Sequence, residues 1–581
     1  MSASLEEITK MTSDSLHNKN CFSYLKNLQF SESVLQRLPA SLANNFRTDS
    51  YNPGYAYADV YTDFFSKVES NIEKIYDKPK QEFVLKKAQL EQINTSSKQT
   101  IPGMETFILR YKQSLEKSLA ELKELDNFIF SIYDNDNDIL EDTFDVIKNI
   151  PLNHAPVNVD IEQSISSALK DKGPRINRTQ SPSEAGSLFG RFTAMIADDF
   201  KPQHTTSLAT VRKYNYTQAH SDAEHLPREY RFGTQAQRDK GIERTSPLFE
   251  RWLQVQAEKA AEKTRSSKKI THIYFNNLGL DRTDAEGKKE RALTQELHQL
   301  EKYPNVAVIT LPADKGLMTG DRYRKTKDSH SYAQVYEEFL GIANQDPHAT
   351  NKIKDFFISD KIRHLIFQDP AGDYTNEEER TQLSQLLDKS FHVMGILPGT
   401  PISSAQKQAV WFHFIKFELT NHIIQKLEPE SINFSCKDAI DRGGVSSAYY
   451  NLIKSFERNT LDKNNIPMDR EEFERALHAA PAMVKARGMN HHLKVIWNAV
   501  DAYVNANYDK LKNNEMKNWL IEWRDINCPH SRVNDLLAQR IEQSIQELKN
   551  AKDAYPESMP MMKPPSIKAY KSWSKLNYNK I

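Results

Sequence analysis

The sequence predicts an α/β core, built on a mixed or parallel central sheet with flanking helices, plus a mainly helical N-terminal domain and a helical C-terminal region. Two short apolar runs, over residues 270–275 and 306–311, are typical of buried strands, and an amphipathic helix is expected between them over 285–303. Such a β-α-β unit favours parallel strands. A third strand is expected over 431–434, and a helix over 445–458 follows it.

The length of the chain, 581 residues, predicts two to four domains. We expect a helical N-terminal domain over 1–150 and a loop-rich segment over 151–245 that packs on the core or links to it. The catalytic domain is expected over 246–500, and a helical C-terminal region with an extended tail over 501–581. The segment over 151–245 shows weak periodicity, and Pro, Ser, Thr, Arg and His are frequent in it.

Charge and cysteine content exclude several classes of protein. Lys+Arg and Asp+Glu both number 78, so no global field would attract nucleic acid, and no nucleic-acid partner is expected. Three cysteines cannot form a disulfide framework, which predicts a reducing compartment. The N-terminus lacks the features of a secretory signal peptide, and no apolar run reaches the length of about 18 residues that crosses a membrane. The expected location is therefore cytosolic or peripheral to a membrane.

In the N-terminal domain we expect helices over 60–76, 81–93 and 104–133, packed as a hairpin or a bundle. These helices are either a structural domain or a module that binds a host protein, a lipid or the membrane surface. The acidic run over 134–138 lacks the glycine and terminal glutamate of an EF-hand loop, so an acidic turn is expected there and no metal site. At the start of the core, Ser246 fits an N-cap and Pro247 the first position of a helix to residue 263.

A cysteine loop joins the third strand to its helix. Cys436 ends the strand, and Arg442 lies six positions later, which is the C-x5-R spacing of cysteine-dependent phosphatases. The backbone N–H groups of such a loop and the N-terminus of the next helix favour a bound phosphate and a cysteine thiolate, and the arginine can bind two phosphate oxygens. We expect Cys436 to be the nucleophile and Arg442 to stabilise the transferring phosphoryl group. Substrate contacts are also expected from Lys437, Asp438, Ala439, Ile440 and Gly443.

A different interpretation of the same loop remains open. Buried thiols are common in protein cores, so Cys436 could be a structural cysteine at a strand end. Against this, the loop is charged where a core cysteine favours apolar neighbours, and a glycine pair and a helix follow it. The glycines are expected to let the backbone leave the loop, with the helix opening after them.

Cationic side chains outside the loop could bind further phosphates of the same substrate. Lys315 follows the strand over 306–311, on the edge where Cys436 is expected, as does Asn277 after the strand over 270–275. Arg487 belongs to a basic cluster over 471–492. For both cations the alternative is a solvated or structural surface residue.

The loop, Cys-Lys-x-x-x-Asp-Arg, is similar to the loops of bacterial effector phosphoinositide phosphatases and inositol polyphosphate 4-phosphatases. Its flanks resemble one branch in particular, the Legionella SidF/SidP effector family of C-x5-R phosphatases. The matching segments are residues 270–279, 306–316 and 483–492, so the resemblance covers roughly 240–500 and none of 1–170.

This resemblance implies a phosphatase that needs no metal and no cofactor, and that acts on the phosphoinositide head group. It implies the 3-position of the ring, as in PI3P, PI(3,4)P2 or PI(3,5)P2. It also implies that Lys437 binds further ring phosphates and that Asp441 is either the general acid or a residue that shapes the loop. For a bacterial source it implies secretion into a host cell by a specialised system. The alternatives are a soluble inositol polyphosphate or phosphoprotein phosphatase, and a helical adaptor with an inactive loop.

Overall fold

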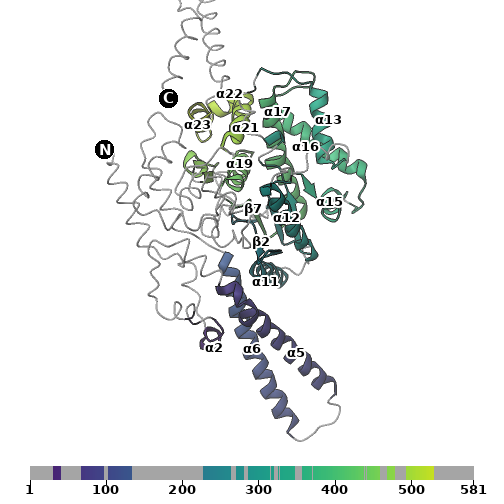
Figure 1. Cartoon of the computed structure of the whole chain (residues 1–581), viewed down its shortest axis with the longest axis vertical. Coiled ribbons are helices and arrows are strands. Elements are labelled where there is room, and N and C mark those ends of the chain that lie inside the picture. The colour runs from purple at the N-terminus through teal and green to yellow at the C-terminus, as the bar shows by residue number, and fades with distance from the viewer. Residues whose placement is uncertain are drawn as a thin grey trace, which may run out of the picture.

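The structure is a computed structural model of the whole chain. It describes the central sheet, the helices that flank this sheet, and the helices that precede and follow this core in the sequence (Figure 1). The described residues are 31–38, 40, 43, 67–96, 103–133, 227–263, 270–280, 285–313, 316–318, 325, 327–346, 356–369, 371–437, 439, 441–457, 467–474, 476, 477 and 493–528.

A five-stranded sheet forms the centre of the α/β fold. Its strands run in the order β1 (Arg228–Tyr230), β7 (Ser431–Ser435), β4 (His272–Asn276), β5 (Val306–Thr310) and β6 (Phe357–Ile358). The first four are parallel to their neighbours, and β6 alone runs antiparallel, at the edge beside β5. The prediction of a mixed or parallel central sheet is confirmed.

Helices cover both faces of this sheet, because alternate residues of each buried strand point to opposite sides. Ile273, Phe275, Ile432 and Phe434 lie in one hydrophobic core. Tyr274, Val306 and Val308 lie in the second core, on the other face. The helices of the first core are α13 (Tyr332–Ala343), α15 (Asp360–Phe367), α16 (Asn376–Val393), α17 (Ser404–His413), α18 (Leu419–Leu427), α19 (Arg442–Glu457), α21 (Leu493–Ala506), α22 (Tyr508–Lys512) and α23 (Trp519–Asn527).

The second core is formed by α2 (Glu32–Leu35), α6 (Met104–Tyr133), α11 (Pro247–Lys263) and α12 (Ala285–His298). Helix α12 continues into the 3₁₀ turn Gln299–Lys302 and joins β4 to the parallel strand β5, as predicted. The helix expected from Ser246 is also present, and the Ser246 hydroxyl accepts from the Phe249 N–H at 3.4 Å.

The π-helical segment Phe414–Glu418 joins α17 to α18 without a break in the helix. Strand β1, and the antiparallel hairpin of β2 (Ala236–Asp239) and β3 (Ile242–Thr245), lie in the stretch that was expected to be loop-rich. A strand of three residues is too short to show an alternating pattern.

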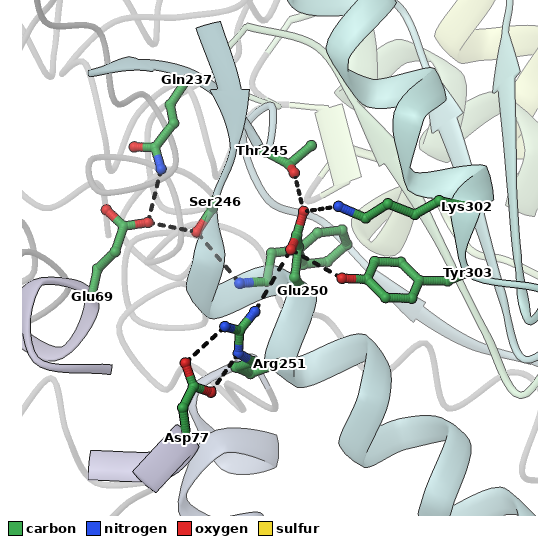
Figure 2. Close-up of polar contacts among 10 residues, drawn as sticks. Glu69, Asp77, Gln237, Thr245, Ser246, Glu250, Arg251, Lys302 and Tyr303 are labelled. Carbon is green, nitrogen blue, oxygen red and sulfur yellow. Dashed lines mark hydrogen bonds and ion pairs between the residues drawn. The ribbon is translucent and has the colours of Figure 1, made fainter. Parts of the chain in front are cut away.

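Two long helices form an arm at the N-terminal side (Figure 1). The π-helical segment Glu73–Asp77 leads into α5 (Lys78–Ser96), and α6 runs back along α5. With 30 residues, α6 is about 45 Å long. Polar contacts fix the base of the arm to α11: Arg251 donates to both Asp77 oxygens at 2.7 and 2.8 Å, and Ser246 donates to Glu69 at 2.8 Å (Figure 2).

Beside this contact, Glu250 of α11 accepts from Lys302 and Tyr303, both at 3.0 Å (Figure 2). Burial alone would raise the pKa of Glu250, but hydrogen bonds from Thr245 and Lys302 lower it overall. The carboxylate is therefore ionised at neutral pH and joins α11 to the turn after α12. Within the described part of the chain, no helix combines the length and the apolar character needed to cross a membrane.

Candidate active site

Cys436 lies directly after β7, at the carboxyl ends of three adjacent parallel strands. Strand β7 is flanked by β1 and β4, and the register that pairs Asn276 with Ser435 places Asn277 beside Cys436. The cysteine is 3% exposed and is not part of a disulfide. In open α/β sheets, this edge is where ligands bind. The position of Cys436 therefore agrees with the predicted strand-loop-helix arrangement.

Arg442 is the first residue of α19, and a buried carboxylate holds its guanidinium. Nη2 donates to Glu290 Oε1 at 3.0 Å, and Nη1 donates to Glu290 Oε2 at 3.4 Å. The Gly279 N–H also donates to Oε2, at 3.0 Å. Arg442 is 9% exposed and Glu290 is 4% exposed. A two-point contact of this kind fixes the plane of the guanidinium as well as its place.

Glu290 was not identified from the sequence, although a signal exists. On α12 it lies on the same side as the buried residues Leu293, Thr294 and Leu297, three, four and seven positions later. An acid on the buried side of an amphipathic helix is costly unless a cation pairs with it. The pattern therefore indicated a buried partner, but sequence spacing could not show that this partner is Arg442.

The loop between β7 and α19 accepts hydrogen bonds from the chain that follows β1. The Thr234 N–H donates to the Cys436 carbonyl at 2.9 Å and to the Lys437 carbonyl at 3.2 Å. Arg231 Nε donates to the Ala439 carbonyl at 2.8 Å. Ala439 itself has φ of +52°, in the left-handed region that an alanine rarely adopts. Neither Arg231 nor Thr234 was foreseen, because both lie in the stretch expected to be loop-rich.

Asn277 joins the carboxyl ends of β4 and β7. Its backbone N–H and its side-chain Nδ2 donate to the Ser435 carbonyl at 2.7 and 3.0 Å. Its Oδ1 accepts from the buried Lys416 ammonium at 2.5 Å and lies 3.1 Å from the Ser446 hydroxyl. Asn277 thus joins β4 and β7 to the π-helical segment and to α19. The expectation that Asn277 lies near Cys436 is confirmed.

A tyrosine hydroxyl is hydrogen-bonded to Ser435, the residue before the cysteine. Tyr274 donates to the Ser435 hydroxyl at 2.9 Å and accepts from the Gln235 N–H at 3.0 Å. Ser435 in turn donates to the Phe232 carbonyl at 3.0 Å. Burial raises the pKa of Tyr274 to about 12, so the phenol stays neutral and keeps donating at neutral pH. These bonds give β7 a fixed end from which the loop begins.

The start of α19 corrects one expectation. The helix begins at Arg442, so Gly443 and Gly444 lie in its first turn and do not precede it. The reason for the first glycine is close packing: a Cβ on Gly443 would lie 2.7 Å from the Phe434 carbonyl oxygen. A glycine here lets the N-terminus of α19 approach the end of β7, and this brings Arg442 and the positive end of the helix dipole close to the loop.

This close approach predicts that Gly443→Ala destabilises the protein. At an ordinary helix position, replacing glycine with alanine raises the stability of the folded protein by roughly 0.5–1 kcal/mol. Here the added methyl group must push α19 away from Phe434, and we expect a net loss of about 1–3 kcal/mol in the free energy of unfolding. Urea unfolding of the two proteins measures this difference. A stabilised Gly443→Ala variant would contradict the close contact.

The structure describes some of the predicted site residues and not others. Lys437 is half-buried, and Asp441 precedes α19 with its carbonyl accepting from the Val445 N–H at 2.9 Å. Cys436, Lys437, Ala439 and Asp441 lie in the short stretch between β7 and α19, and Arg442 and Gly443 are the first two residues of α19. Asp438, Ile440, Lys315 and Arg487 fall outside the described residues.

Among the described residues, no group of three or more His, Cys, Asp or Glu side chains is arranged to hold a metal ion. The stretch from Cys436 to the first turn of α19 contains a buried thiol, a guanidinium held by Glu290 and the N-terminus of a 16-residue helix. A thiol in such a stretch can act as a nucleophile, and a guanidinium and a helix N-terminus can bind an anion. Comparisons with protein-family models, with curated proteins and with solved structures find no match for this chain.

Proposed function

We propose that this protein is a cysteine-dependent phosphatase that hydrolyses phosphate monoesters of phosphoinositide head groups. The observation that supports this most strongly is the Arg442–Glu290 pair at the N-terminus of the helix that follows Cys436, the residue directly after a central parallel strand. A buried carboxylate that orients an arginine at the N-terminus of a helix prepares the guanidinium to bind an oxyanion. A structural cysteine at a strand end would not require such a partner.

The proposed reaction has two steps. The Cys436 thiolate attacks phosphorus, an S–P bond forms, and the P–O bond to the leaving alcohol breaks as that oxygen takes up a proton. Water then attacks phosphorus, the S–P bond breaks, and orthophosphate leaves with the thiolate restored. Arg442 and the N-terminus of α19 stabilise the charge on the phosphoryl oxygens in both steps. We assign the proton donor of the first step to Asp441, which directly precedes Arg442.

The substrate class is proposed from the resemblance of the loop together with Lys437. A half-buried lysine next to the nucleophile adds positive charge where a ring with several phosphates would lie. The proposed substrates are PI3P, PI(3,4)P2 and PI(3,5)P2, with cleavage at the 3-position. The lipid would be reached from the aqueous side of a membrane.

A substrate panel tests this proposal. Phosphate release is measured from short-chain forms of all phosphoinositides, from soluble inositol phosphates and from phosphotyrosine and phosphoserine peptides, with EDTA present throughout. The expected result is release from the 3-phosphorylated lipids that orthovanadate blocks. Release only from soluble inositol phosphates or peptides would favour the corresponding soluble phosphatase instead. No release from any compound would contradict the proposal and favour an adaptor.

A further inference from the structure

Three carbonyl oxygens of the loop between β7 and α19 are turned toward the chain that follows β1. They belong to Cys436, Lys437 and Ala439, and they accept from the Thr234 N–H and from the Arg231 guanidinium. Both Thr234 and Arg231 are buried. The segment 231–234 therefore supports the loop on the side that these three carbonyl oxygens face.

We propose that Arg231 is a positioning residue for anion binding at Cys436, a role that rests on the proposed phosphatase function. A carbonyl oxygen carries partial negative charge and would repel a phosphate inside the loop. In a planar trans peptide the C=O and the N–H point in opposite directions. Holding the Cys436 carbonyl on the outer side therefore turns the Lys437 N–H to the opposite side of the loop. Arg231 does the same for the carbonyl of Ala439.

The conformation of Ala439 explains why this support needs a charged side chain. An alanine with φ of +52° carries a conformational cost relative to an ordinary backbone conformation. A hydrogen bond from a buried guanidinium is stronger than one between neutral groups and can offset that cost. Without it, the peptide after Ala439 would relax, and its carbonyl would no longer be held outside.

The same guanidinium reaches a second part of the chain. Arg231 Nη1 donates to the Ala476 carbonyl at 2.6 Å. One side chain thus joins β1, the loop and the segment around residue 476. A lysine at this position has a single ammonium in place of the planar fork and is not expected to bind both carbonyls in the same geometry.

The test uses the reactivity of Cys436, which needs no turnover. The rate of Cys436 alkylation by iodoacetamide is measured by mass spectrometry across a pH series, with and without orthovanadate. Wild type is compared with Arg231→Lys and Arg231→Met. The matched control is Arg228→Met, which removes another arginine of the same strand region, one that contacts Tyr230 at 3.3 Å and lies over the ring of Phe130.

We expect Arg231→Met to weaken the protection of Cys436 by orthovanadate about tenfold, which is the effect of one lost hydrogen bond to a charged group. Alkylation of Cys436 in this variant should also need a higher pH than in wild type. In both measurements Arg231→Lys should give a value between those of Arg231→Met and wild type, and Arg228→Met should give the wild-type value. Adding Ala439→Gly to Arg231→Met should recover part of the protection, because glycine adopts positive φ without strain. A purely structural role for Arg231 would lower stability without this recovery.

The outcomes separate this inference from the proposed function. If Arg231→Met remains folded by circular dichroism and keeps both wild-type vanadate protection and the wild-type pH profile, the positioning role is wrong, whatever the protein hydrolyses. If the wild-type protein releases no phosphate from any substrate, but orthovanadate protects Cys436 less well in Arg231→Met than in wild type, the phosphatase proposal fails and the positioning role stands. If orthovanadate does not protect wild-type Cys436, both are wrong.

Discussion

Replacing Cys436 with serine is expected to lower kcat/KM on the best phosphoinositide substrate by roughly 10³-fold or more, the scale on which loss of a nucleophile acts. A serine hydroxyl is the wrong group here because its pKa is far above that of a thiol, so the helix N-terminus and Arg442 cannot keep it ionised. Substrate binding should persist, because the loop and Arg442 are unchanged. The measurement is steady-state phosphate release, together with binding of the same lipid to the variant.

The chain offers a matched control for this change. Cys528 is also buried, with its sulfur 3.9 Å from the Trp497 carbonyl, and it lies after α23 rather than after the central strand. Cys528→Ser makes the same chemical change and should leave kcat/KM close to that of wild type. Equal activity of Cys436→Ser and wild type would contradict the proposed chemistry. Equal losses in both serine variants would indicate a general effect on the fold.

The second large effect is expected for Arg442→Lys, with a fall in kcat of about 10²–10³-fold, as when one oxyanion donor is removed. Lysine keeps the positive charge but lacks the planar guanidinium, which donates to both Glu290 oxygens and has further N–H groups that would bind the phosphoryl oxygens. The loss should therefore appear mainly in kcat, because the transferring phosphoryl group needs this geometry most. Steady-state kinetics that separate kcat from KM check this.

Glu290→Gln tests how far the carboxylate contributes to the same effect. It keeps the shape of the side chain but removes its charge, and we expect a smaller fall in kcat, about tenfold. A double-mutant cycle with Arg442→Lys should be strongly non-additive because the two side chains are in contact. Arg363→Lys is the control, since Arg363 forms another buried pair, with Glu379, outside the loop. It should lower stability and leave the kcat of the folded protein unchanged, and additive effects of the first two changes would contradict the proposed coupling.

Much of the core could be predicted because its elements follow simple patterns. The apolar strands β4 and β5, with the amphipathic α12 between them, could be recognised by periodicity, and the parallel pairing follows from that order. The cysteine between β7 and α19 could be placed at the carboxyl edge of the sheet for the same reason. The helix α6 of the arm is long and amphipathic enough to be recognised in the same way.

The residues that fix the loop from outside could not be predicted. Arg231 and Thr234 act through contacts with residues more than 200 positions away in the chain, and one strand of three residues brings them there. The start of α19 at Arg442 also depends on tertiary contact, because two glycines disfavour a helix unless close packing requires them. Local patterns thus identified the groups proposed to carry the chemistry, while the support that orients them depends on the fold.

The most direct test is to trap the reaction on its nucleophile. Wild-type protein is mixed with its best phosphoinositide substrate, quenched in acid within milliseconds and digested, and the peptide that contains Cys436 is analysed by mass spectrometry. We predict one added phosphoryl group on Cys436, absent in Cys436→Ser and lost when quenching is delayed until substrate is consumed. Phosphate release without any phosphorylated Cys436, or with the phosphoryl group on another residue, would contradict the assignment of Cys436 as the nucleophile.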